Sequence, residues 1–203
     1  MNQAHSVVTK RQNRTKADIE MAFIRLIKDK GFQAISVKNI VEEADYNRST
    51  FYLYYQDKYQ LADVLLQSKM KGLEEAVAAP YVPGQIVYME NLDSTFLNII
   101  KYIFENRDFF QLLNYQDTLP GINTELPAVF SKIYQEQFKF ETINHQEVNM
   151  KYFKRYHSYG FYGLILQWVQ DDFRTPQLEF VQEFIKLTKT LISSLEFVGE
   201  SSE

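Results

Sequence analysis

Apolar residues along most of the chain recur three or four positions apart, which is the spacing of a helix. Val37, Ile40, Val41 and Ala44 follow this spacing over one short stretch and would share one face of a helix. Ser36 directly precedes them, in the position of an N-cap that accepts a hydrogen bond from the first turn. The pattern predicts a short helix that begins just after Ser36.

A second, shorter helix is predicted over 48–55, after a turn of four residues, 44–47. Asn47 is its N-cap, and Phe51 and Tyr55, one helical turn apart, can pack inward. The outward positions then carry an arginine, two hydroxyls and three large side chains: Arg48, Ser49, Thr50, Tyr52, Leu53 and Tyr54. Two short helices joined in this way, with such an outer face, are typical of a helix-turn-helix whose second helix enters the major groove of DNA.

This region resembles the DNA-binding domain of the tetracycline-repressor-like (TetR) family of transcriptional regulators. The resemblance runs from about Thr15 to Leu66 and rests on Gly31-Phe32, Ser36, Ala44, Thr50-Phe51-Tyr52, Tyr54-Tyr55 and Asp57-Lys58. One departure is Asp45, which stands where the family usually has Gly in the turn. Asp tolerates the left-handed backbone conformation less well than Gly, so some local strain is expected there.

The resemblance implies which residues contact DNA. Arg48 at the start of the second helix is expected to pair with a guanine, and Leu53 to meet a thymine methyl group. Tyr54 and Lys58 match phosphate-contacting positions of the family, and Lys38 on the first short helix is expected to join them. The predicted DNA-binding residues are Lys38, Asn47, Arg48, Ser49, Thr50, Tyr52, Leu53, Tyr54 and Lys58.

The distribution of charge supports this placement. The net charge of the chain is −4, which by itself does not suggest a DNA-binding protein. Residues 1–60, however, carry ten Lys and Arg against seven Asp and Glu, whereas residues 61–203 carry twelve against nineteen. Because attraction to phosphate is local, the positive end lies where the helix-turn-helix is predicted.

Composition excludes several other classes of protein. The chain has no cysteine, so it has no disulfide framework, no zinc-finger spacing and no thiol catalysis. The three histidines are scattered and no motif for nucleotide binding or hydrolysis is present, so we expect no enzyme, no cofactor and no metal. No apolar run is long enough to span a bilayer and the N-terminus lacks a signal-peptide core, which predicts a cytoplasmic protein without a membrane partner.

The whole chain is predicted to be all-α, with about nine helices in two domains. Residues 1–60 form the helix-turn-helix domain, in which 1–14 are expected to be mobile. Lys10, Arg11, Arg14 and Lys16 are there either a solvated tail or an arm that touches DNA. Residues 61–203 form a regulatory and dimerisation domain without a β-rich region. Its candidate helices, after one over 57–79, are 87–105, 107–116, 125–141, 147–171 and 176–197.

The last two of these helices are apolar on more than one face, which requires burial on nearly all sides. TetR-like proteins are two-fold dimers through such helices, so the resemblance implies a homodimer that binds a palindrome. The alternative is that both helices lie wholly inside one subunit. The dimer-interface candidates are Trp168, Val181, Phe184, Thr188 and Ile192.

The second domain is also rich in aromatic residues, which form either an ordinary core or an apolar ligand pocket with a few polar groups. The pocket candidates are Tyr102, Arg107, Phe109, Phe110, Tyr115, Tyr134, Tyr152 and Tyr156. We expect a dimeric repressor that a small molecule releases from its operator. The ligand would turn the 57–79 helix, taken here as the only continuous connection between the domains, and change the separation of the two DNA-binding heads. The alternative is a TetR-like regulator controlled by a protein partner, or a nucleoid-bound interaction module without a ligand.

Overall fold

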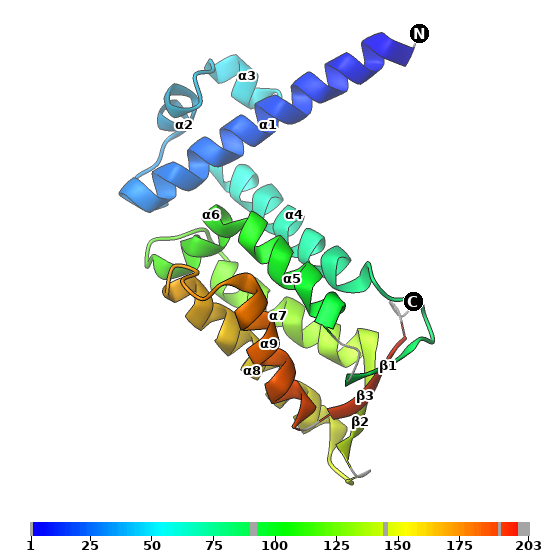
Figure 1. Ribbon diagram of the computed structural model, residues 1–203. Helices are drawn as coiled ribbons and strands as arrows, with labels where there is room; N and C mark the ends of the chain where they lie inside the picture. Colours follow the sequence, from blue (N-terminus) through cyan, green and yellow to red (C-terminus); the bar gives the residue numbers. More distant parts are fainter. Residues whose placement is uncertain (1, 90–92, 144–145, 191, 199–203) are drawn as a thin grey trace. The chain divides into compact units, whose positions relative to one another are not determined.

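The computed structural model describes residues 2–89, 93–143, 146–190 and 192–198. Of residues 2–10 and 93–97 it describes only the backbone. It divides into two compact units (Figure 1). Unit 1 contains the residues up to Ser68 together with Leu112–Ile122, and unit 2 contains the rest of the described chain. Unit 1 therefore extends eight residues beyond the expected boundary at 60 and includes a segment that is distant in the sequence.

Unit 1 is built from α1 (Asn2–Lys30), α2 (Val37–Glu43), α3 (Arg48–Tyr52) and the first half of α4 (Lys58–Ala78). Residues 2–14, which were expected to be mobile, are helical as the start of α1, which begins at Asn2. No Gly or Pro interrupts the sequence between Asn2 and Lys30, so the helix can continue toward the N-terminus.

The core of unit 1 lies between α1 and the helix-turn-helix. Ile19, Phe23 and Ile27 form one face of α1 and are fully buried. Phe51 and Tyr55 are buried as predicted. α1 ends at Lys30. Gly31 follows it with φ of 76°, the left-handed conformation that commonly terminates a helix.

The helical part of unit 2 is the second half of α4 with five further helices. α9 packs against α5, and Trp168 of α8 stacks near Phe104 of α5 with 6.2 Å between the ring centroids. The helices are α5 (Asp93–Glu105), α6 (Arg107–Phe110), α7 (Ile122–Lys132, whose first residue belongs to unit 1), α8 (Met150–Gln170) and α9 (Gln177–Lys189). A 3-10 turn, Gln111–Asn114, follows α6 and belongs to unit 1 from Leu112 on.

Unit 2 also contains a three-stranded antiparallel sheet that the sequence analysis did not predict. Its order is β1 (Ile86–Tyr88), β3 (Ile192–Phe197), β2 (Phe138–Thr142), with a bulge at Glu141/Thr142 (Figure 1). The candidate helices 87–105, 125–141 and 176–197 were thus each too long.

The sequence of β2 shows why this segment is not helical. Phe138 and Phe140 alternate with Lys139 and Glu141, which is the period of a strand and not of a helix. α7 leads into β2 through a single π-helical turn, Ile133–Gln137. The predicted class remains correct: the described residues form nine α-helices with only this small sheet.

In the described part of the chain, no helix combines the length and the apolar character that crossing a membrane requires. The same residues contain no group of three or more His, Asp or Glu side chains placed to hold a metal ion.

Candidate DNA-binding interface

The two predicted N-caps start the helices of the helix-turn-helix. Ser36 accepts a hydrogen bond from the Asn39 N–H, and the Asn39 side chain accepts from the Ser36 N–H at 3.0 Å, which forms a capping box. Asn47 Oδ1 accepts from the Thr50 N–H at 2.8 Å. The same oxygen accepts from the hydroxyls of Ser49 (2.6 Å) and Thr50 (2.9 Å). The side-chain oxygen of Asn47 is therefore used to cap α3. A contact of Asn47 with DNA stays a prediction.

The turn between α2 and α3 takes the conformation that the family resemblance implied. Asp45 has φ of 57°, the left-handed value for which Gly is the usual residue. The following N–H of Tyr46 donates to the carbonyl of Val41 at 2.9 Å, which closes the turn. Tyr46 also donates its hydroxyl hydrogen to Asp18 Oδ2 at 2.9 Å and so ties the turn to α1.

α3 is held by its inner face and free on its outer face. Phe51 is fully buried, and Tyr55 donates its hydroxyl hydrogen to Glu20 on α1 at 3.1 Å. Burial, together with the Glu20 carboxylate, raises the pKa of the Tyr55 hydroxyl well above its usual range, so it stays a neutral donor. On the outer face Tyr52 is 55% exposed and Leu53 79% exposed. A large apolar side chain left this exposed on a capped, anchored helix indicates a contact surface.

Of the nine predicted DNA-binding residues, seven lie within 47–54, in α3 and at its ends, Lys38 lies on α2 and Lys58 begins α4. Arg48 and Ser49 are exposed, and Thr50 and Tyr54 are half-buried. Lys38 lies on the exposed side of α2 and pairs with Glu42 at 3.6 Å. Lys58 differs from the other eight residues, because its ammonium group is bound to backbone carbonyls.

The Lys58 ammonium group is fully used inside unit 1. It donates to the backbone carbonyls of Phe32 (3.0 Å), Gln33 (3.1 Å) and Ile35 (2.9 Å), all in the loop between α1 and α2. It also lies over the rings of Phe32 and Tyr59, 4.7 and 5.3 Å from their centroids. Because an ammonium has three hydrogens, a phosphate contact would require breaking these bonds. This geometry argues against the predicted phosphate contact of Lys58.

A groove that the sequence analysis did not predict lies between α1 and α3. It has a volume of about 540 Å³ and is open to solvent. Arg11 and Arg14 of α1 line one side, and Lys16 lies 5.6 Å from the centre of the Tyr54 ring. The groove residues are Arg11, Gln12, Arg14, Thr15, Tyr46, Thr50, Leu53 and Tyr54. The uninterrupted helix-forming sequence before residue 15 was the signal that α1 would carry these cations along α3.

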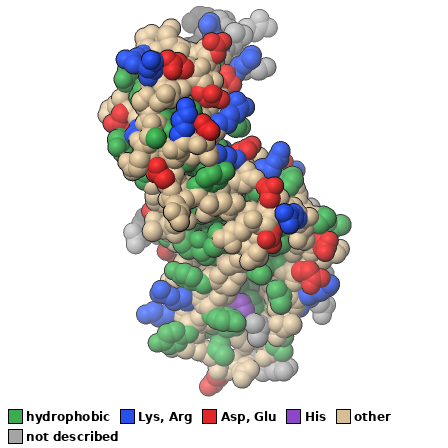
Figure 2. Space-filling view, turned by 90° about the vertical axis from the view of Figure 1, so that its left-hand side faces the viewer, with side chains coloured by type: hydrophobic (Ala, Val, Ile, Leu, Met, Phe, Trp, Pro, Cys, Tyr) green, Lys and Arg blue, Asp and Glu red, His purple; other side chains and the backbone are tan. Residues whose placement is uncertain are grey.

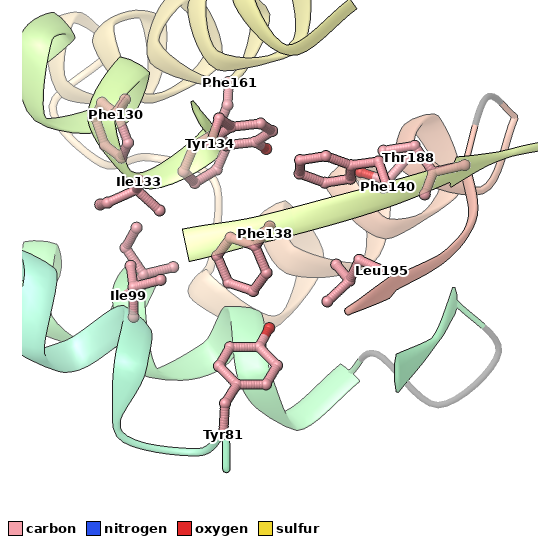
Figure 3. A pocket seen from close by; sticks show the side chains of 12 residues that line it. Tyr81, Ile99, Phe130, Ile133, Tyr134, Phe138, Phe140, Phe161, Thr188 and Leu195 are labelled. Atoms are coloured by element: carbon pink, nitrogen blue, oxygen red, sulfur yellow. The ribbon is translucent and has the colours of Figure 1, made fainter. Parts of the chain in front are cut away.

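In unit 2, a cavity is enclosed by α4, α5, α7, α8, α9 and the sheet (Figure 3). Its volume is about 40 Å³, and its lining is mainly aromatic and aliphatic. Phe138 and Phe140 reach it from β2, and Tyr81 points toward Phe138 (Figure 3). Burial raises the pKa of the Tyr134 hydroxyl, which is the polar group on the α7 side of the cavity.

Of the eight predicted pocket residues, only Tyr134 lines this cavity. Phe109 and Phe110 are core residues, and Tyr102 donates its hydroxyl hydrogen to the Lys69 carbonyl at 3.0 Å. The other four are exposed and do not line this cavity: Arg107, Tyr115, Tyr152 and Tyr156. Tyr134 and Tyr156 both line a separate, open hollow. The strand residues that do line the cavity were missed, because the segment around 138 was expected to be helical.

The five dimer-interface candidates are buried within their own chain, which corrects the reasoning that they lacked cover. Trp168 is 2% exposed, donates from Nε1 to the Thr175 carbonyl at 2.8 Å and stacks on Phe180. Phe184 packs on Phe161 with 4.4 Å between ring centroids. The remaining three are also buried: Val181, Thr188 and Ile192. Phe184 and Thr188 nevertheless line an open hollow on the surface of unit 2.

A different, exposed surface lies on α8 and α9. An open hollow of about 460 Å³ runs along Tyr156, Tyr159, Gly160 and Leu187, with His157 beside them. Tyr156 is 71% exposed and Leu187 52% exposed. Burial lowers the pKa of His157, so this residue adds no fixed positive charge to the hollow. Figure 2 shows hydrophobic side chains gathered around a histidine on one face of unit 2.

Comparison with known proteins identifies the family of the chain. Residues 22–65 match the model of bacterial regulatory proteins of the TetR family, and residues 90–190 match the model of a transcriptional regulator C-terminal region. Together these matches cover more than two thirds of the chain.

Individual relatives are distant. The HTH-type transcriptional regulator YxbF of Bacillus subtilis (strain 168) is 23% identical over 77% of this chain and 40% of its own length. The chain spans about two fifths of the length of the curated relatives that it matches.

Solved structures share the fold. The dihydroxyacetone kinase operon activator DhaS superposes with a TM-score of 0.58, at 16% identity over 88% of this chain and 98% of that one. A TetR transcriptional regulator from Streptococcus agalactiae 2603V superposes with a TM-score of 0.57, at 18% identity over 90% and 98%. The two family matches, the capped helix-turn-helix and this shared fold lead to one conclusion: the chain belongs to the TetR family of bacterial transcriptional regulators.

Proposed function

We propose that this chain is a homodimeric, cytoplasmic repressor that binds a palindromic operator, without catalytic activity of its own. The observation that carries the proposal is the outer face of α3, which is exposed on a helix capped by Asn47 and anchored by Phe51. On this face Arg48 pairs with a guanine and Leu53 meets a thymine methyl group. Family membership supports DNA binding, and the assignment of each residue is ours.

Contacts to the DNA backbone come from both sides of α3. Tyr54 and Lys38 keep the phosphate-contacting role expected for them. Arg11 and Arg14, which line the groove beside Thr50, supply the cations that Lys58 does not. Each phosphate neutralised adds about 0.9 to the slope of log affinity against log salt, so the arginines are expected to appear in that slope.

The dimer forms through the exposed surface of α8 and α9 and not through the buried stripes. Five helical residues reach only a few base pairs, and a two-fold pair of heads doubles that contact. Nothing lies within 4 Å of the place where a Cβ would stand on Gly160 or Gly163, so another helix can approach both closely. Tyr159 and Leu187 flank Gly160 in the hollow and give the surface the apolar area that association needs.

Selection of bound DNA from a random pool tests this proposal. We expect an inverted repeat, with half-sites about one helical turn apart or somewhat more. Light scattering is expected to give a dimer at micromolar concentration, and a reporter gene placed behind the selected site is expected to be switched off. A monomer with full affinity for a half-site, or selected DNA without symmetry, would contradict the dimer. Activation of the reporter would contradict the repressor role and leave the other parts of the proposal standing.

Within this proposal, a protein partner is the favoured releasing signal. The enclosed cavity of about 40 Å³ is far below the ~300–1,000 Å³ of pockets that hold drug-sized ligands. A small molecule would have to displace several packed aromatic side chains before it could enter. A thermal-shift screen with a metabolite library checks this: a compound that both raises the melting temperature and releases the operator would restore the small-molecule reading.

A further inference from the structure

The segment 112–122 lies in the sequence between elements of unit 2 but belongs to unit 1. The chain therefore passes between the units three times: within α4 after Ser68, between Gln111 and Leu112, and between Ile122 and Asn123. This corrects the expectation that the 57–79 helix is the only continuous connection. Two of the three crossings start and end in this single segment.

The segment is a compact, folded element. Leu112, Leu119 and Ile122 are almost completely buried. Thr118 donates its hydroxyl hydrogen to the Leu112 carbonyl at 2.6 Å, which closes the segment on itself. An exposed linker would show neither the burial nor the internal bond, so the segment is an ordered part of unit 1.

Asp117 connects the segment to the loop that leads into the helix-turn-helix. Its carbonyl accepts from the Phe32 N–H at 3.1 Å. Its carboxylate accepts from the Gln33 N–H, at 3.2 Å to Oδ1 and 3.0 Å to Oδ2. Gly31 permits this approach, because a Cβ at that position would overlap the Asp117 carboxylate. Asp117 thus satisfies the two N–H groups that follow directly on the end of α1.

Lys58 binds the carbonyl groups of the same loop: its ammonium group donates hydrogen bonds to the carbonyls of Phe32, Gln33 and Ile35. Ser36, the N-cap of α2, follows at once. A carboxylate and an ammonium therefore hold the N–H and C=O groups of one four-residue loop. The direction in which α2 leaves α1 depends on both, and α3 follows α2 after a tight turn.

We infer that residues 112–122 form a strap that positions the helix-turn-helix within unit 1, with Asp117 as the positioning residue for DNA binding. The effect on operator binding rests on the proposed function. When the strap shifts, the Phe32 and Gln33 N–H groups lose their acceptors, and the loop that sets the direction of α2 loosens. Loss of the Asp117 contacts is therefore expected to weaken operator binding without altering any residue proposed to contact DNA.

The test uses the full chain and an operator selected from a random pool. Asp117→Ala removes the carboxylate, and Asp117→Asn keeps one amide oxygen as an acceptor. Asp63→Ala is the matched control, because it removes the same charge from an exposed position of unit 1. Measured at one salt concentration, operator affinity is expected to be about tenfold weaker for Asp117→Ala than for the control, with Asp117→Asn between them. Hydrogen exchange of the Gln33 amide is expected to accelerate in the same order.

A second measurement separates positioning from mere stability. Each variant is assayed at a temperature where denaturation shows it to be fully folded, and the loss of affinity is expected to persist there. If Asp117→Ala then binds as tightly as Asp63→Ala, the inference is overturned. Absence of operator binding by the unaltered chain would instead refute the proposed function, so the two failures are distinguishable.

Discussion

Lys58 offers the sharpest test of the structure against the family resemblance. The resemblance places Lys58 on a DNA phosphate, whereas the structure places its ammonium on three backbone carbonyls at 2.9–3.1 Å. Lys58→Met keeps the aliphatic part of the side chain and removes only the charge and its donors. The two assignments then predict different losses, one in DNA binding and one in the stability of unit 1.

The expected loss of stability follows from the three bonds. A hydrogen bond from a charged group contributes about 1.5–3 kcal/mol when buried, and about 0–1 kcal/mol when exposed. Lys58 is half-buried, so we expect Lys58→Met to lower the free energy of unfolding of unit 1 by about 2–4 kcal/mol. Lys38→Met is the matched control: Lys38 is 63% exposed and has one ion pair on its own helix, worth less than about 0.5 kcal/mol.

Denaturation followed by far-UV circular dichroism measures this loss, and hydrogen exchange of the 32–36 amides assigns it to the loop. The only tryptophan, Trp168, lies in unit 2 and cannot report on unit 1. With the folded fractions matched, the salt dependence of operator binding is expected to stay unchanged in Lys58→Met. If Lys58→Met is as stable as Lys38→Met and its salt slope is flatter by about 1, Lys58 contacts phosphate and our reasoning is refuted.

Three further predictions address the base contacts, the dimer and a buried hydroxyl. Arg48→Ala is expected to relax the preference at one base pair by about 1–3 kcal/mol, seen by repeating the DNA selection, whereas Lys38→Ala should weaken all sequences alike. Leu187→Asp should give a folded monomer in light scattering, because Leu187 is exposed; Trp168→Ala should instead cost about 3–5 kcal/mol of unfolding free energy, since Trp168 is 2% exposed. Equal effects of these two changes on assembly would argue against the proposed surface. Burial raises the pKa of Tyr102 to about 12. The unfolded chain therefore loses this proton first as pH rises above 10, so stability contributed by the neutral hydroxyl is lost between about pH 10 and 12. Tyr102→Phe is expected to lessen that alkaline loss in denaturation series, and an unchanged pH profile would contradict it.

Local chemistry explains why the helix-turn-helix could be predicted from the sequence. Ser36 and Asn47 act through bonds to residues three positions away, and Gly31 acts through its own backbone conformation. Such interactions depend on neighbours in the sequence, so a short stretch of residues determines them. The inward packing of Phe51 follows in the same way from helical spacing.

The prediction was less reliable where distant segments compete for the same residues. Ile192 continues the helical stripe of α9 by spacing alone, yet it lies in β3, because strands at 86–88 and 138–142 provide hydrogen-bonding partners on both sides. A period of three or four residues cannot reveal a partner that lies fifty residues away. For the same reason the strand residues around the cavity were not foreseen.

Burial and pairing of particular side chains were likewise decided by the tertiary structure. A stripe such as Phe184 looks the same whether it packs against its own chain or against a partner, and only the position of the other helices shows that it is covered. The carbonyls around Lys58 and the approach of Asp117 to Gly31 join residues 23 to 86 positions apart. The sequence by itself determined the two short helices of the helix-turn-helix, their N-caps and the outward position of Tyr52 and Leu53 on α3. Which lysine is free, which apolar face stays exposed and what holds the helix-turn-helix in place depend on contacts that form only when distant segments meet.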